Sequence, residues 1–109
     1  MLTFENYEKI VMKEKVYGCG NKILYPTLGL TGEAGEVSDK VKKVLRDNNG
    51  DFDVQKSIEI AKELADVLWY VTALSQDLGF DLDFIAQMSI DKVLSRRNRN
   101  VIHGEGDNR

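Results

Sequence analysis

The sequence of 109 residues contains one cysteine, one proline and one histidine, and these shortages exclude several classes of protein. Cys19 alone cannot form an internal disulfide, and no Cys/His cluster is present that could hold zinc. No apolar run approaches the ~20 residues that a membrane-spanning helix needs. The opening stretch MLTFENYEKI is acidic and amphipathic, so we expect no signal peptide. The prediction is a reduced, cytoplasmic protein that does not associate with membranes.

No block of like charge stands out either, and acidic residues outnumber basic ones 18 to 15. A nucleic-acid binder that relies on bulk positive charge is therefore excluded. The length fits one domain, residues 1–109, with one core. Because so small a chain exposes a large share of its surface, a self-associating face is expected.

Apolar residues recur at helical intervals along the chain and predict four helices, at about residues 3–17, 27–46, 54–78 and 82–97. Thr3 and Asp81 are the expected N-caps, and Gly79 is the expected C-cap. Residues 47–51 form a turn cluster, and the tail from about 98 to 109 has no periodicity. Four helices in one small domain predict an all-α bundle.

Three glycines, Gly29, Gly32 and Gly35, lie inside the second predicted helix. Each costs roughly 1 kcal/mol relative to alanine in a helix interior. One explanation is a loop that extends to about Gly35, with a later helix start. The other is that a neighbouring backbone or ligand approaches so closely that a Cβ atom has no room.

Two acidic pairs are the candidates for chemistry: Glu33 and Glu36 on the second predicted helix, and Glu63 and Asp66 on the third. Residues three apart share a helix face, and both pairs border an apolar stripe. If the two helices form an antiparallel hairpin centred on the turn cluster, Glu33 is level with Asp66 and Glu36 with Glu63. Four carboxylates should then converge between the two helices.

Four such carboxylates repel one another, by roughly a few kcal/mol per close pair at an effective dielectric near 20. A hard cation, shared protons or basic neighbours must offset this repulsion. Magnesium prefers oxygen ligands, and four acids indicate more than one ion. Such a site suits phosphoryl chemistry, because the ions neutralise phosphate charge and lower the pKa of bound water. The alternative is that the acids form only a solvated helix face.

The stretches LGLTGEAGEVSDKVKK and KELADVLWYV resemble the MazG-like superfamily of all-α nucleoside triphosphate pyrophosphohydrolases. Its signature is ExxE on one helix and ExxD on the next, here Glu33, Glu36, Glu63 and Asp66. The ending KVLSRRNRNVIHGEGDNR also resembles the C-terminal stretch of small, single-domain members. The resemblance therefore covers most of the chain, from about residue 28 to residue 109.

The resemblance implies a bundle completed by homo-oligomerisation, as a homodimer or homotetramer. It implies Mg²⁺, with Mn²⁺ as the alternative, held by the four acids. It also implies cleavage of a (deoxy)nucleoside triphosphate between the α- and β-phosphates, in house-cleaning of the nucleotide pool. Asp107 and Arg109 match the tail of the family, whereas Ser89 stands where many members carry asparagine.

Candidates for substrate contact are Lys40, Trp69, Tyr70, Lys92 and Arg96. Trp69 could stack on a base, or pack in the core or an oligomer interface. Tyr70 could bond a sugar hydroxyl or support a metal ligand, or be an interface tyrosine. Lys92 and Arg96 could bind triphosphate or the carboxylates, or only complement the helix dipole. Lys40 could simply pair with the glutamate one turn earlier.

Two other functions stay open at this point: a dUTP- or dCTP-specific diphosphatase of the same superfamily, and a non-catalytic helical protein used in assembly or regulation. A di-iron carboxylate bundle fits poorly. Such sites need Glu-x-x-His motifs on helices, and the single histidine, His103, lies in the tail.

Overall fold

The computed structural model describes residues 1–18 and 20–108, which form four α-helices and no strand. The helices are α1 (Phe4–Glu14), α2 (Leu24–Asp47), α3 (Val54–Asp77) and α4 (Leu82–Asn98). The predicted all-α class is confirmed, and Cys19 and Arg109 lie outside the described residues. In the described ranges no helix combines the length and apolar character that crossing a lipid bilayer requires.

Side-chain caps mark three of the four helix starts. Thr3, Asp53 and Asp81 each accept a hydrogen bond from the backbone N–H three residues further on. The N-caps predicted at Thr3 and Asp81 are therefore confirmed. Gly79, which follows the end of α3, has φ +88°, a conformation that favours glycine and suits the predicted helix stop.

Two helix boundaries differ from the prediction. α1 ends at Glu14 rather than near Tyr17, because the chain turns extended at Lys15 and leads toward the end of α3. α2 begins at Leu24 rather than Thr27. Pro26 is accommodated in the first helical turn, where a backbone N–H would have no partner within the helix.

α2 continues unbroken through its three glycines, so the explanation of a loop extending to Gly35 is wrong. A Cβ atom on Gly29 would lie 2.6 Å from Cδ1 and Cζ of Tyr70, which no real contact tolerates. Close approach is therefore confirmed for Gly29, although the neighbour is an aromatic ring rather than a backbone. At Gly32 and Gly35 an added Cβ atom would meet nothing within 4 Å.

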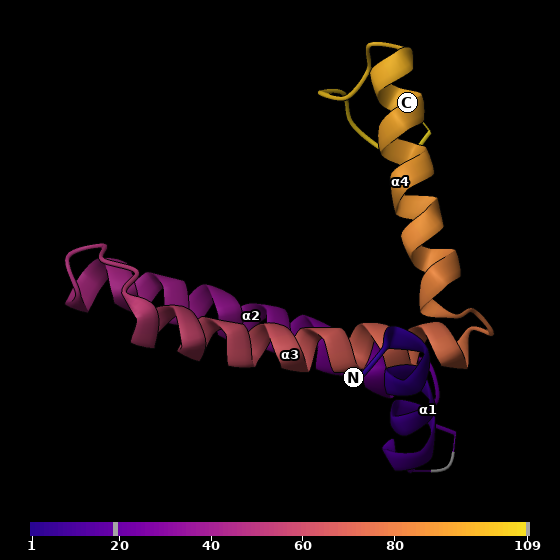
Figure 1. The fold of residues 1–109 in the computed structure, drawn as a ribbon, viewed down its shortest axis with the longest axis horizontal. Coiled ribbons are helices and arrows are strands. Elements are labelled where there is room, and N and C mark those ends of the chain that lie inside the picture. Colours follow the sequence, from indigo (N-terminus) through magenta and orange to yellow (C-terminus); the bar gives the residue numbers. More distant parts are fainter. Residues whose placement is uncertain (19, 109) are drawn as a thin grey trace.

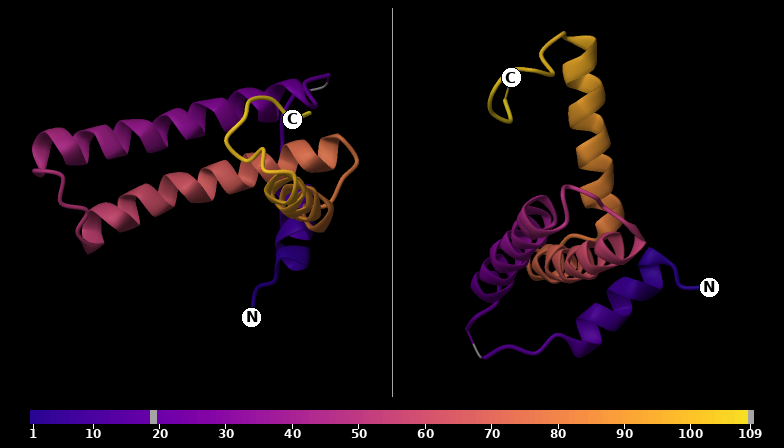
Figure 2. Two further views of the ribbon diagram at one scale, coloured as in Figure 1. Left: turned by 90° about the horizontal axis from the view of Figure 1, so that it is seen from above. Right: turned by 90° about the vertical axis from the view of Figure 1, so that its left-hand side faces the viewer.

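α2 and α3 form a long antiparallel hairpin, and this pair makes the most extensive helix contact (Figure 1). The hairpin closes through a turn at which Asn49 and Gly50 both have positive φ angles, inside the predicted turn cluster. α1 and α4 both meet α3 near the open end of the hairpin, and from there α4 projects away (Figures 1 and 2). Within the described chain α4 contacts α1 and α3 but not α2.

The four helices therefore do not close into a bundle within one chain. The Cα radius of gyration is 16.8 Å, whereas a compact domain of this length has about 13 Å. Among the described residues the buried apolar side chains are Val11, Pro26, Val44 and Ala73, and α4 buries none. Large apolar residues are instead exposed along α4: Phe84, Met88, Ile90, Val93 and Leu94.

Candidate functional site

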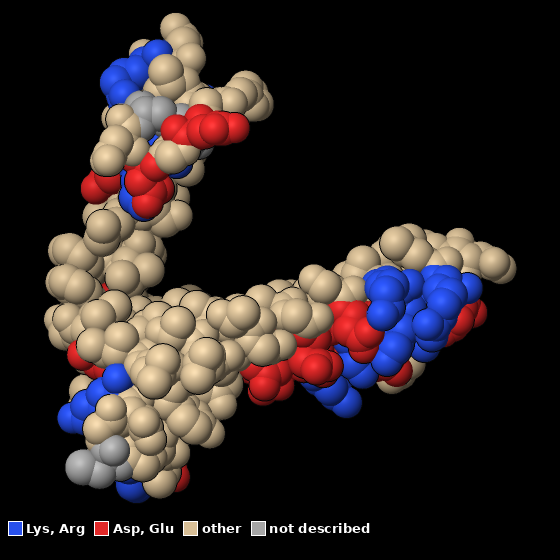
Figure 3. Space-filling view, turned by 180° about the vertical axis from the view of Figure 1, so that it is seen from behind, with Lys and Arg blue, Asp and Glu red and all other residues tan. Residues whose placement is uncertain are grey.

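Three of the four predicted carboxylates meet between α2 and α3. One carboxylate oxygen from each of Glu33, Glu63 and Asp66 lies within 4.8 Å of the other two. The hairpin register accounts for this meeting, because residues equally distant from the turn are level with one another. Acidic side chains gather along the middle of the hairpin, with basic side chains toward its closed end (Figure 3). The three residues are called the carboxylate cluster below.

Glu36 lies one turn further along α2 and is exposed. It is not one of the three carboxylates whose oxygens approach within 4.8 Å of one another. Glu33 is half-buried whereas Glu36 is exposed, so Glu36 lies on the more solvent-accessible side of α2. Its charge nevertheless helps to raise the pKa of Glu33, so it borders the carboxylate cluster.

The electrostatics of the carboxylate cluster favour a bound cation. Burial, followed by the charges of Asp66 and Glu63, raises the pKa of Glu33 above its usual 4.5. In the described part of the chain, none of the ion pairs involves these three carboxylates. A donor set made only of carboxylate oxygens matches the preference of hard divalent cations. The cluster could therefore hold such an ion.

Tyr70 lies at the edge of the carboxylate cluster. Its ring packs over Gly29, and its pKa is raised by burial, then by Tyr25 and by the charge of Glu33. Tyr25 in turn stacks on Tyr17, with ring centroids 5.0 Å apart. Tyr25 was not among the predicted site residues, although it precedes Gly29 by four residues and so shares its helix face.

Asp77 anchors the segment between α1 and α2, and it too was not among the predicted site residues. Its carboxylate accepts hydrogen bonds from Lys15 Nζ at 2.8 Å, Tyr17 OH at 2.6 Å and the backbone N–H of Ile23 at 3.2 Å. The Asp77 side chain is only 2% exposed. The sequence does contain a signal for its role: Asp77 is the one charged residue of α3 after Asp66.

Trp69 contacts α1. Its ring meets that of Tyr7 edge to face, with centroids 6.4 Å apart and planes at 86°. Burial raises the pKa of Tyr7, a hydrogen bond with Thr72 partly offsets this, and the charge of Asp66 adds to it. The Tyr7–Trp69 pair therefore lies on the side of α3 that faces α1, near one member of the carboxylate cluster.

Two of the basic candidates lie apart from the carboxylate cluster. Lys92 and Arg96 are on α4, which leads away from the hairpin (Figure 1). Both pair with Asp107 of the tail. Lys40 is half-buried on α2. The expected ion pair between Lys40 and Glu36 is absent from the ion pairs of the described residues.

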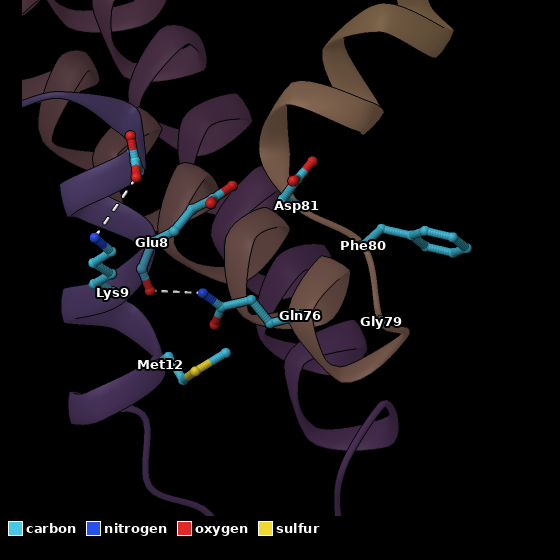
Figure 4. Close-up of a pocket in the computed structure, with 8 residues that line it drawn as sticks. Glu8, Lys9, Met12, Gln76, Gly79, Phe80 and Asp81 are labelled. Carbon is cyan, nitrogen blue, oxygen red and sulfur yellow. Dashed lines mark hydrogen bonds and ion pairs between the residues drawn. The ribbon is translucent and has the colours of Figure 1, made fainter.

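A pocket of about 390 Å³ lies where α1 meets α3 and α4 (Figure 4). Glu8 accepts the backbone N–H of Leu82 at the start of α4, and Gln76 Nε2 donates to the Glu8 carbonyl at 2.6 Å. Gln76 Oε1 is buried and, within the described residues, unpaired. The pocket contains no member of the carboxylate cluster. Hydrogen bonds in the pocket therefore link α1 to α3, through Glu8 and Gln76, and α1 to α4, through Glu8 and Leu82.

The geometry agrees with comparisons to known proteins. The model of a family described as "MazG nucleotide pyrophosphohydrolase domain" matches residues 24–102, which include both acidic pairs and all of α4. Gene 37 protein of Mycobacterium phage L5 is 46% identical over 85 residues, which cover 78% of this chain and 75% of the phage protein. No solved structure matches. The resemblance inferred from the motifs is confirmed, and the chain belongs to the MazG nucleotide pyrophosphohydrolase family.

Proposed function

We propose that the protein is a magnesium-dependent nucleoside triphosphate pyrophosphohydrolase. It cleaves a (deoxy)nucleoside triphosphate between the α- and β-phosphates and releases the monophosphate and pyrophosphate. Its role is house-cleaning of the cytoplasmic nucleotide pool. The observation that carries this proposal is the meeting of three carboxylates from α2 and α3 within 4.8 Å, in a chain of this family.

The carboxylate cluster would hold the cation, and Glu36 would complete the set from one turn along α2. When bound, Mg²⁺, or Mn²⁺ in its place, would neutralise phosphate charge and lower the pKa of a bound water molecule. One glutamate of the site accepts a proton from the attacking water as general base.

The remaining candidates bind the substrate. Tyr70, beside Glu33, bonds a sugar hydroxyl, and Lys40 offsets phosphate charge from α2. Trp69 stacks on the base if the edge contact with Tyr7 leaves one ring face accessible. Lys92 and Arg96 contact the triphosphate from a second copy of the chain, because α4 carries them away from the hairpin of their own chain (Figure 1).

The exposed face of α4 supports self-association as part of the proposal. α4 exposes apolar side chains along its length and buries none, so burial against a partner would remove them from water. A homodimer, or a homotetramer built from two dimers, would then complete both the bundle and the site.

The test is a panel of nucleoside triphosphates incubated with Mg²⁺, with monophosphate, pyrophosphate and orthophosphate separated by chromatography. Replacing Glu33, Glu36 or Glu63 by Gln, or Asp66 by Asn, should lower kcat by about 100-fold or more at unchanged helicity. Glu59→Gln is the matched control, because Glu59 lies one turn before Glu63 and pairs with Lys56. Orthophosphate as the product, or near-normal turnover in the cluster variants, would contradict the proposal.

The same panel separates the alternatives. Turnover confined to dUTP or dCTP identifies a specific diphosphatase on the same scaffold. A non-catalytic assembly protein predicts no turnover and no Mg²⁺-dependent stabilisation by nucleotide. A bound ligand at 100 times its Kd adds ~2.7 kcal/mol to stability, so a thermal-shift comparison with and without Mg²⁺ detects the difference.

A further inference from the structure

The tail after α4 folds back onto that helix and covers its two cations. Arg96 Nη2 donates to Asp107 Oδ1 at 3.2 Å, to the Asp107 carbonyl at 3.3 Å and to the Gly106 carbonyl at 3.4 Å. Lys92 Nζ lies 3.2 Å from the same Oδ1 atom. A single carboxylate oxygen therefore bridges two basic side chains one helical turn apart.

The surroundings of this contact form a site for an anion. Ile85, Met88 and Val93 line a pocket of about 370 Å³ together with the two cations and Asp107. The Arg96 side chain is 13% exposed on a helix that buries no residue, because the tail lies over it. With Asp107 in place, the three formal charges sum to +1, and without it they sum to +2. A phosphate dianion therefore matches this pair of cations better than a carboxylate does.

The contacts of the tail with Lys92 and Arg96 are long or exposed, so an anion of higher charge could replace them. Its hydrogen bonds to Arg96 measure 3.2–3.4 Å, beyond the usual range for charged partners. Lys92 and Asp107 are 43% and 76% exposed, and ion pairs this accessible to water contribute little stability. Lys92 first, and then Arg96, lower the pKa of Asp107, so its carboxylate is charged at neutral pH.

We propose that Asp107 is an internal anion that occupies a phosphate-binding site formed by Lys92 and Arg96. Docking of the tail and binding of a pyrophosphate or triphosphate anion are then mutually exclusive. This inference rests on the phosphate contacts assigned to Lys92 and Arg96 under the proposed function. It adds that the tail competes with substrate and product for those contacts, and so weakens retention of released pyrophosphate.

The experiment is calorimetric titration of the full-length protein with inorganic pyrophosphate in EDTA, so that the carboxylate cluster holds no metal ion. Asp107→Asn keeps the size of the side chain and removes its charge. This variant should bind pyrophosphate about three- to fivefold more tightly than the natural protein. Glu105→Gln, the same change in charge two residues earlier in the tail, should leave the affinity unaltered. Adding Arg96→Ala to the Asp107→Asn variant should remove the gain in affinity for pyrophosphate.

Nuclear magnetic resonance gives a second readout that does not need a variant. Pyrophosphate added to the natural protein should increase the fast motion of the Asp107 amide. An affinity of Asp107→Asn no higher than that of Glu105→Gln would overturn the inference, and so would a tail that stays docked when pyrophosphate is bound.

These outcomes are distinct from those of the hydrolysis assay. If no nucleotide is hydrolysed but Asp107→Asn gains affinity, the proposed function fails while the competition stands. If hydrolysis depends on the carboxylate cluster but no affinity is gained, only the role of Asp107 is wrong.

Discussion

At the scale of single residues, Gly29 shows how one missing side chain positions the site. A Cβ atom there would collide with the Tyr70 ring, which lies beside Glu33. Gly29→Ala should therefore displace the ring and lower the free energy of unfolding by about 1–3 kcal/mol. Urea unfolding at one fixed protein concentration measures this loss.

Gly32→Ala is the matched control on the same helix. An added Cβ atom meets nothing within 4 Å, so the higher helix propensity of alanine should stabilise the protein by up to about 1 kcal/mol. Equal losses in both variants would mean that contact with Tyr70 is not the reason for the glycine at position 29.

Asp77 makes the free energy of unfolding depend on pH in the acidic range. Burial alone would raise its pKa, but hydrogen bonds from Lys15, Tyr17 and Ile23 outweigh burial and hold it below the usual 3.8. The unfolded state then binds more protons than the native state in this range, so stability rises with pH. The contribution is complete above about pH 3.8 and is lost as pH falls through the lower native pKa.

Asp77→Asn should destabilise the protein by roughly 3 kcal/mol at neutral pH, since it leaves Lys15 largely buried without a counter-charge. Its unfolding free energy should also fall less steeply on acidification below pH 4 than that of the natural protein. Urea titrations across this range measure both effects. Asp51→Asn, a change at an exposed carboxyl group of the turn, should reproduce neither.

At the scale of helices, α4 depends on α1 for its start. Glu8 of α1 accepts the backbone N–H of Leu82, while the N-cap Asp81 accepts that of Phe84. The Glu8 side chain extends from α1 toward Asp81 at the start of α4 (Figure 4). Glu8→Ala should cost about 1 kcal/mol of stability, comparable to the loss of an N-cap. Thermal unfolding compares it with Glu5→Ala, because Glu5 lines the same pocket but forms an exposed pair with Lys9. An equal loss in both variants would exclude the capping role.

The helices themselves were predictable because their signals are local. Periodicity located α3 to within one residue at its end, and the caps at Thr3 and Asp81 marked two helix starts. The end of α1 and the start of α2 were misplaced, since hydrogen bonds to Asp77, more than fifty residues away, decide the path between them.

The contacts of the site also divide into those that local sequence signals predict and those that depend on packing between distant residues. The meeting of Glu33 with Asp66 follows from hairpin register, which the turn cluster reveals. The packing of Tyr70 over Gly29 depends on how deeply the two helices interlock, which a pattern of residue types does not specify. The contact between Asp107 and Arg96 arises in a tail without periodicity, so no rule of spacing predicts it.

At the scale of the whole molecule, the separation of the basic pair on α4 from the carboxylate cluster predicts a site shared between two chains. Glu33→Gln and Arg96→Ala should each inactivate a homodimer. When the two variants are coexpressed, half of the dimers are mixed and each contains one intact site. About a quarter of the natural activity should therefore return.

Coexpression of Glu33→Gln with Glu63→Gln is the control. Both changes lie in the α2–α3 hairpin, so a mixed dimer has two damaged hairpins and no intact site. Native mass spectrometry verifies that mixed dimers form. Mixed dimers of the first pair without recovered activity would place Lys92 and Arg96 outside the substrate site.

The exposed apolar side chains of α4 have a consequence for the proposed activity. If α4 finds its apolar contacts only on another chain, assembly is second order in the amount of protein. At low expression the yield of working sites would then rise with the square of that amount, so a modest increase in synthesis would raise the proposed nucleotide clearance steeply. Dilution in the test tube would reverse the effect and lower the turnover per milligram.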